Sequence, residues 1–209
     1  MKFIQISLVL ASFSLFSQSF IDLSIKNIER GTIYKSDKTQ IEGKITSPLS
    51  PQQGNIKIRT SGKNIKTKSH EIDSIVFDNQ AKTTIIYSPT ISLSNYNNIK
   101  NKKPEWLEVV IKGEFLLYKN TYLEHRKEYS KSTTQYYLKR KNEPFPALIG
   151  VKTNEPIPST NDRSFNKNLE KYFSDQPEIL QKIKEKEYNL NEMHLLVNKY
   201  NELVNSKQK

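Results

Sequence analysis

The chain has 209 residues, with 33 lysine and arginine residues against 22 aspartate and glutamate residues, and a formal net charge of +11. It contains no cysteine, which excludes disulfide bonds, thiolate zinc sites and the lipid-modified cysteine of a bacterial lipoprotein. The length suffices for a core without covalent cross-links and favours one domain, or one domain with a helical appendage.

Residues 1–19 have the pattern of a signal peptide. Lys2 precedes an apolar run over residues 3–16, and the small polar residues Ser17 and Ser19 follow. A short cationic start, an apolar segment too short to span a bilayer and a small-residue exit are typical of a secretory leader. We therefore predict an exported protein of the periplasm or the outer membrane. No later stretch approaches the roughly 20 apolar residues of a membrane helix, so no transmembrane helix is expected.

Residues 20–151 are predicted to form a β-rich domain, because short runs alternate between apolar and polar residues from Arg30 onward. Turn-forming residues predict three hairpins, at Ser36-Asp37-Lys38, at Ser61-Gly62 and at Asp78-Asn79.

The most apolar stretch after the leader is "EWLEVVIKGEFLLYKNTY". Its apolar residues occupy both alternating positions, so these strands are expected to be buried on both faces. Leu107, Val109 and Ile111 are predicted to share one face, and Phe115 continues it. Gly113 interrupts the run and indicates a bulge or a tight bend.

Residues 152–162 contain two prolines and several turn formers, which predicts a linker. The apolar period then lengthens to between three and four, so residues 163–205 are predicted to form three helices, and residues 206–209 a disordered tail. The predicted fold class is α+β: an antiparallel β-sheet or small β-sandwich followed by a three-helix C-terminal segment.

Two features mark the helix starts. Pro177 suits the first position of a helix, with Ser174 and Asp175 as candidates to cap it. Asn189 followed by Glu192 predicts a capping box at the start of the last helix.

The ending "FNKNLEKYFSDQPEILQKIKEKEYNLNEMHLLVNKYNE", the Gly-x-Ile segments at 31–33 and 43–45, and "VVIKGEFLLYKN" together carry a family pattern. They resemble an uncharacterised family of exported Bacteroidetes proteins, in which a β-rich module precedes C-terminal helices and, in some members, an outer-membrane β-barrel. Many of those proteins have a cysteine where this chain has Gln176, so the resemblance implies no thiol role at this position. It implies an envelope location and no established activity.

The acid–imidazole group in "SHEID", which contains His70, Glu71 and Asp73, is the best catalytic candidate. A carboxylate beside a histidine can orient it as a general base, which would fit an exported hydrolase. A turn with all three side chains in water explains the same residues. The histidines lack metal-ligand spacing and no phosphate-binding loop is present, so neither a metal ion nor a cofactor is predicted.

A second candidate is a basic, aromatic patch for binding an anion. Tyrosine rings beside cations are typical of surfaces that stack on and neutralise anionic polymers. The patch comprises Tyr136, Tyr137, Lys139, Arg140, Lys141, Arg126 and Lys127. An ordinary strand with Tyr136 and Leu138 packed inward, followed by a charged turn, also explains this pattern.

The sequence therefore favours a non-enzymatic envelope protein that serves as a binding or accessory subunit. Its expected partner is an envelope protein or an anionic envelope polymer, and export disfavours a nucleic acid. The alternatives are a binder of anionic glycan or lipopolysaccharide through the basic patch, and the hydrolase that uses His70. The positive net charge fits an anionic partner, although a solvated basic surface accounts for it as well.

Overall fold

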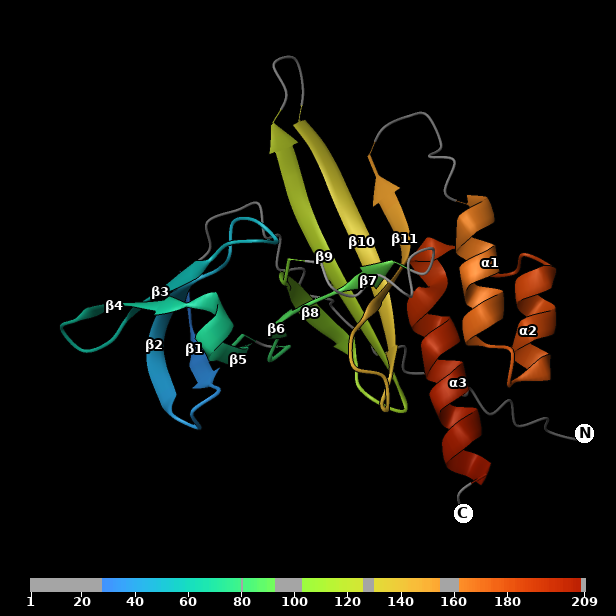
Figure 1. The fold of residues 1–209 in the computed structure, drawn as a ribbon, viewed down its shortest axis with the longest axis horizontal. Coiled ribbons are helices and arrows are strands. Elements are labelled where there is room, and N and C mark those ends of the chain that lie inside the picture. The colour runs from blue at the N-terminus through green and yellow to red at the C-terminus, as the bar shows by residue number, and fades with distance from the viewer. Residues whose placement is uncertain (1–27, 80, 93–102, 126–129, 155–161, 208–209) are drawn as a thin grey trace, which may run out of the picture.

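The computed structural model describes residues 28–79, 81–92, 103–125, 130–154 and 162–207 (Figure 1). The described chain forms one eleven-stranded sheet and three C-terminal helices, so the predicted α+β class is confirmed. Within these residues, no helix combines the length and the apolar character needed to span a lipid bilayer.

The strands are β1 (Ile28–Lys35), β2 (Gln40–Thr46), β3 (Asn55–Arg59), β4 (Asn64–Lys68), β5 (Ile72–Phe77), β6 (Thr84–Ser88), β7 (Ile91–Ser92), β8 (Glu105–Ile111), β9 (Phe115–His125), β10 (Ser130–Arg140) and β11 (Ala147–Thr153). Their order in the sheet is β4-β3-β2-β1-β5-β6-β8-β9-β10-β11-β7. Most consecutive strands pair with each other, but β5 pairs with β1 rather than with β4, and β7 pairs with β11 rather than with β6 or β8. All neighbours are antiparallel except β11 and β7. The first four strands and the helices therefore lie at opposite ends of the molecule (Figure 1).

The three predicted hairpins are all present. Lys38 closes the β1–β2 turn with φ 72°, and Gly62 closes the β3–β4 turn with φ 89°. In the first turn Asp37 accepts hydrogen bonds from the Thr39 hydroxyl and the Thr39 amide. These bonds lower the pKa of Asp37 to about 2. The third hairpin joins β5 to β6 after Phe77.

The prediction that Leu107, Val109 and Ile111 share a face that Phe115 continues was wrong for Ile111 and for Phe115, which both lie under the helices. The register between β8 and β9 shifts between Val109 and Ile111. This bulge rotates the end of β8, since an extra residue breaks the two-residue alternation. Ile111 therefore packs with the residues under the helices, whereas Leu107 and Val109 pack with Tyr118 on the opposite face. Gly113 lies in the tight turn that joins the two strands, as predicted.

The helices are α1 (Asp162–Tyr172), α2 (Pro177–Lys184) and α3 (Met193–Lys207), and they cover one face of the β8–β11 end of the sheet (Figure 1). β11 runs two residues into the predicted linker. Residues 155–161, like the predicted leader at 1–19, lie outside the described part of the chain. α3 continues to Lys207, past the start of the predicted tail.

The helix starts agree with the sequence in two of three respects. Pro177 occupies the first turn of α2, and Asn189 with Glu192 forms the predicted capping box. The expectation that Ser174 or Asp175 caps α2 was wrong, because Gln176 is the N-cap and makes no side-chain capping bond. Asp175 instead binds Arg140 on the sheet.

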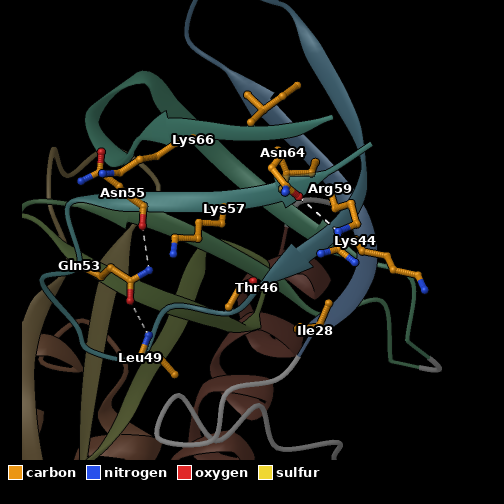
Figure 2. A pocket seen from close by; sticks show the side chains of 12 residues that line it. Ile28, Lys44, Thr46, Leu49, Gln53, Asn55, Lys57, Arg59, Asn64 and Lys66 are labelled. Carbon is orange, nitrogen blue, oxygen red and sulfur yellow. Dashed lines mark hydrogen bonds between the residues drawn. The ribbon is translucent and has the colours of Figure 1, made fainter. Parts of the chain in front are cut away.

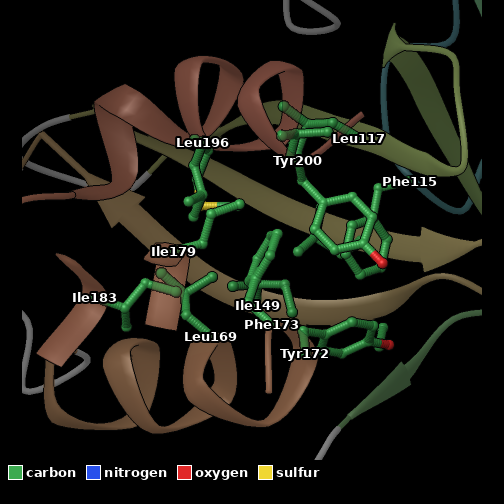
Figure 3. Packing of buried hydrophobic residues seen from close by; sticks show 14 of the residues in the cluster. Phe115, Leu117, Ile149, Leu169, Tyr172, Phe173, Ile179, Ile183, Leu196 and Tyr200 are labelled. Atoms are coloured by element: carbon green, nitrogen blue, oxygen red, sulfur yellow. The ribbon is translucent and has the colours of Figure 1, made fainter. Parts of the chain in front are cut away.

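Two apolar clusters lie on the same face of the sheet, here called the inner face. The helix-covered cluster joins the helices to β8–β11 (Figure 3) and includes Phe115, Leu117, Leu138, Ile149, Leu169, Phe173, Ile179, Leu196 and Tyr200. The N-terminal cluster is built by the strands alone and contains Ile33, Ile45, Ile56, Ile58, Ile72, Ile75, Phe77, Ile85 and Trp106. In β1–β4 the alternate side chains consequently point away from this core.

Asn201 fixes α3 to the sheet. Its side-chain oxygen accepts the Phe115 amide hydrogen at 2.8 Å, and its side-chain nitrogen donates to the Phe115 carbonyl at 3.0 Å. The amide group thus completes two backbone hydrogen bonds at the start of β9. A Cβ atom at Gly113 would collide with the Asn201 side chain, so the glycine in the turn permits this approach.

Candidate functional site

Four cationic side chains gather on the outer face of β1–β4, away from the N-terminal cluster. Lys44 of β2 lies opposite Arg59 of β3, and Lys57 of β3 lies opposite Lys66 of β4. All four residues are exposed. Each alternates along its strand with residues that face the core, so hairpin register places the four charges on one surface.

These side chains line an open groove with a volume of about 670 Å³, here called the cationic groove (Figure 2). Its lining residues come from β1–β4 and the β2–β3 loop. They are Ile28, Lys44, Thr46, Leu49, Gln53, Asn55, Lys57, Ile58, Arg59, Asn64, Ile65 and Lys66. No aspartate or glutamate is among these described residues. The potential in the groove is therefore positive, because no lining carboxylate offsets the four cations.

The loop at the end of the groove is held in place by several hydrogen bonds. The Gln53 side chain accepts the Leu49 amide hydrogen at 2.9 Å and donates to the Asn55 carbonyl at 2.8 Å (Figure 2). The buried Trp106 donates its indole hydrogen to the Gln53 carbonyl at 3.0 Å and its amide hydrogen to the Pro51 carbonyl at 2.7 Å. The core thus fixes the shape of the groove through this loop.

Polar side chains in the groove leave acceptor and donor groups beside the cations. Arg59 donates from Nε to the Asn64 side-chain oxygen at 3.2 Å, which orients the guanidinium along the β3–β4 pair. The terminal guanidinium nitrogens are the usual donors to phosphate, sulfate or carboxylate. Lys66 also lies on the sheet's edge strand, where a lysine discourages pairing with another strand.

The basic patch predicted around β10 is divided between the two faces of the sheet. Tyr136 packs against the helix-covered cluster, whereas Tyr137 packs on the opposite face with Tyr118. Tyr137 is 2% exposed, and its hydroxyl donates to Glu105 at 2.8 Å. Burial and the nearby carboxylate of Glu105 raise the pKa of Tyr137. The two rings therefore do not form one stacking surface.

Arg140 binds residues of the helical segment and is not an unpaired cation of an exposed patch. It forms an ion pair with Asp175 at 2.9 Å and donates to the Tyr200 hydroxyl at 3.1 Å and to the Tyr172 carbonyl. Its guanidinium lies 4.6 Å from the centre of the Phe115 ring. One side chain of β10 thereby contacts α1, the α1–α2 turn and α3.

The other cations of the predicted patch differ in their surroundings. Lys139 is half-buried, and Lys141 is exposed and pairs with Glu114 at 3.3 Å. Arg126 and Lys127 lie outside the described residues.

The acid–imidazole group does not converge in the described structure. Glu71 lies 3.8 Å from the ammonium of Lys35, and Asp73 accepts the Ser36 hydroxyl hydrogen at 2.7 Å. Both carboxylates thus contact the end of β1 and its turn, while His70 is exposed in a short 3-10 turn.

A second pocket, of about 880 Å³, separates α3 from the β5–β6 turn. Its lining includes Glu108 and Lys119, which form an ion pair at 3.3 Å with exposed fractions of 12% and 8%. Burial raises the pKa of Glu108 even though Lys119 acts to lower it. The pair lies on the inner face: Glu108 follows Trp106 of the N-terminal cluster by two residues of β8, and Lys119 lies opposite Tyr136, which packs against the helix-covered cluster. It is the polar junction between the two cores.

No cluster of three or more histidine or acidic side chains suited to a metal ion occurs among the residues that the structure places. Sequence reasoning missed the cationic groove, although alternating cations in "NIKIR" and "NIKTK" were a usable signal. Comparison with protein-family models, with curated proteins and with solved structures gives no significant match for this chain.

Proposed function

We propose that the chain is an exported, non-enzymatic binding or accessory protein of the cell envelope, and that its cationic groove holds an anionic envelope component. The observation that carries the proposal is the meeting of Lys44, Lys57, Arg59 and Lys66 in one groove without a lining carboxylate. Sulfate, phosphate or carboxylate groups placed there would interact favourably with all four cations.

The proposed location rests on the leader-like residues 1–19 and on the resemblance to exported Bacteroidetes proteins. The chemical groups that line the groove support binding rather than catalysis. It is lined by cations, amides and aliphatic side chains, and these groups recognise charge without supplying a general acid–base pair.

A double substitution in the groove tests this proposal. We expect Lys57→Ala with Lys66→Ala to weaken binding of dextran sulfate, a soluble polyanion, about thirtyfold at low salt. Two lost contacts of about 1 kcal/mol each account for this factor. Isothermal titration calorimetry measures the affinity, and raising the salt concentration should weaken wild-type binding because it screens exposed charges.

The matched control is Lys167→Ala with Lys184→Ala. These exposed lysines lie on α1 and α2, so the control removes the same charge from the helical end of the molecule. It should leave the affinity within about a factor of three of wild type. Equal losses in the two double variants would show that binding follows net charge alone, and the groove would then not be the site.

A further inference from the structure

We infer that the anionic partner of the groove is a lipid surface: the outer face of β1–β4 docks on an anionic bilayer, with Ile28 and Leu49 in the lipid. This inference rests on the proposed function and makes its ligand class specific. It is based on where the exposed apolar side chains lie on the molecule. Ile28, Leu49 and Leu195 are the large apolar residues that the described part of the chain exposes, at 57%, 45% and 53%.

Two of these three residues line the cationic groove. Ile28 lies opposite Thr46 in the β1–β2 register, and Leu49 follows Thr46 by three residues at the start of the loop. Lys44 is two positions before Thr46 on the same face. Single exposed apolar residues are ordinary on a protein surface. A pair of them beside four cations forms an amphipathic surface.

Leu49 is presented by a fixed loop. Its amide hydrogen binds the Gln53 side chain, and Trp106 holds the Pro51 and Gln53 carbonyls from the core. The hydrogen bonds therefore keep the loop in the conformation that leaves Leu49 exposed. A water-soluble polyanion gains little from an isoleucine and a leucine, whereas acyl chains remove both side chains from water.

The charges suit the same partner. Anionic headgroups attract lysine and arginine within about one Debye length of the surface. The long stems of Lys57, Lys66 and Lys44 can lie along an apolar surface while their ammonium groups stay among the headgroups. A second copy of this chain fits poorly, since a symmetric contact would bring four cations against four cations. Charge complementarity thus selects an anionic lipid surface over self-association.

Vesicle flotation tests the inference. The wild type and all variants are purified in the same form, without the predicted leader at residues 1–19. Phosphatidylcholine vesicles that contain phosphatidylglycerol should bind the protein, and vesicles of phosphatidylcholine alone should not. Ile28→Ser with Leu49→Ser should lower the affinity for the anionic vesicles about tenfold, the loss expected for two partly exposed aliphatic side chains. Its affinity for dextran sulfate should fall by less than this, because the four groove cations that bind the polyanion are unchanged.

Leu195→Ser is the matched control, because it removes the third exposed apolar side chain, on α3. It should bind both probes as wild type does. Wild-type affinity of the Ile28→Ser, Leu49→Ser protein for anionic vesicles would overturn the inference, as would equal binding to both vesicle types. Intact dextran sulfate binding in those cases would leave the proposed function standing. If circular dichroism shows altered folding in the double variant, Ile28→Ser alone repeats the test, because Ile28 lies outside the loop. Its affinity for the anionic vesicles should fall about threefold.

Discussion

Replacing Arg140 with alanine is expected to lower the free energy of unfolding by about 3 kcal/mol, with the largest effect on the helices. The substitution removes hydrogen bonds to Asp175, Tyr200 and the Tyr172 carbonyl. It also removes a guanidinium packed on the Phe115 ring. Urea unfolding followed by circular dichroism measures the change, and limited trypsin digestion reports whether the helices open first.

The effect of this substitution should depend on pH. Partial burial acts to raise the pKa of Asp175, but hydrogen bonds from Arg140 and Tyr200 and the charge of Arg140 bring it below its ordinary value of 3.8. A carboxyl group with a lowered pKa in the folded state stabilises the fold above its unfolded pKa, and this contribution is lost as the pH falls through the folded value. The difference between wild type and Arg140→Ala should therefore shrink below about pH 4.

Lys141→Ala is the control for Arg140→Ala, because Lys141 is the next residue and its side chain is 74% exposed. Its effect on unfolding should stay within about 0.5 kcal/mol. Similar stability of the two variants would contradict the role assigned to Arg140 as the link between the sheet and the helices.

Lys119→Met is expected to cost about 3 kcal/mol near neutral pH, because it leaves the Glu108 carboxylate buried without the Lys119 ammonium. Methionine keeps the aliphatic stem, so the loss reflects charge more than packing. Chemical unfolding measured over a pH series gives the free energy. In a double-mutant cycle, Glu108→Leu combined with Lys119→Met should recover most of the loss.

The pH dependence of the free energy of unfolding distinguishes a loss of charge pairing from a loss of packing. Burial already raises the pKa of Glu108 above 4.5 in the wild type. A carboxyl group with a raised folded pKa contributes stability below its unfolded pKa, and that contribution is lost as the pH rises through the folded value. Without Lys119 the pKa should rise further, so the stability of Lys119→Met should fall more steeply above pH 4.5 than that of wild type. An equal deficit at pH 4 and pH 8 would contradict a charge effect.

The hairpins and helices were predictable because their signals are local. Turn residues around Asp37 and Gly62 set the hairpins, Pro177 set a helix start, and Asn189 with Glu192 set a capping box. The face assignment of Ile111 failed for lack of such a signal. A bulge depends on how β8 pairs with β9, and no residue type within β8 specifies it.

The candidate site was harder to predict because cations that are close in the sequence need not be close on the surface of the folded protein. Lys139 and Arg140 are adjacent in β10, but adjacent residues of a strand point to opposite faces, and Lys141 lies in the turn that follows. Lys44 and Lys66 are 22 positions apart, and β3 brings them together through two successive registers. Asp175 illustrates the same limit, since its partner Arg140 is 35 residues away.

The cationic groove is the proposed binding site for the anionic partner. The most direct test is a nitrogen-15 NMR titration of the chain with sucrose octasulfate, a compact polyanion. We expect the largest changes in amide chemical shift at Lys44, Lys57, Arg59 and Lys66. Changes centred instead on Lys139 and Lys141 at the end of β10, or on the helices, would contradict it.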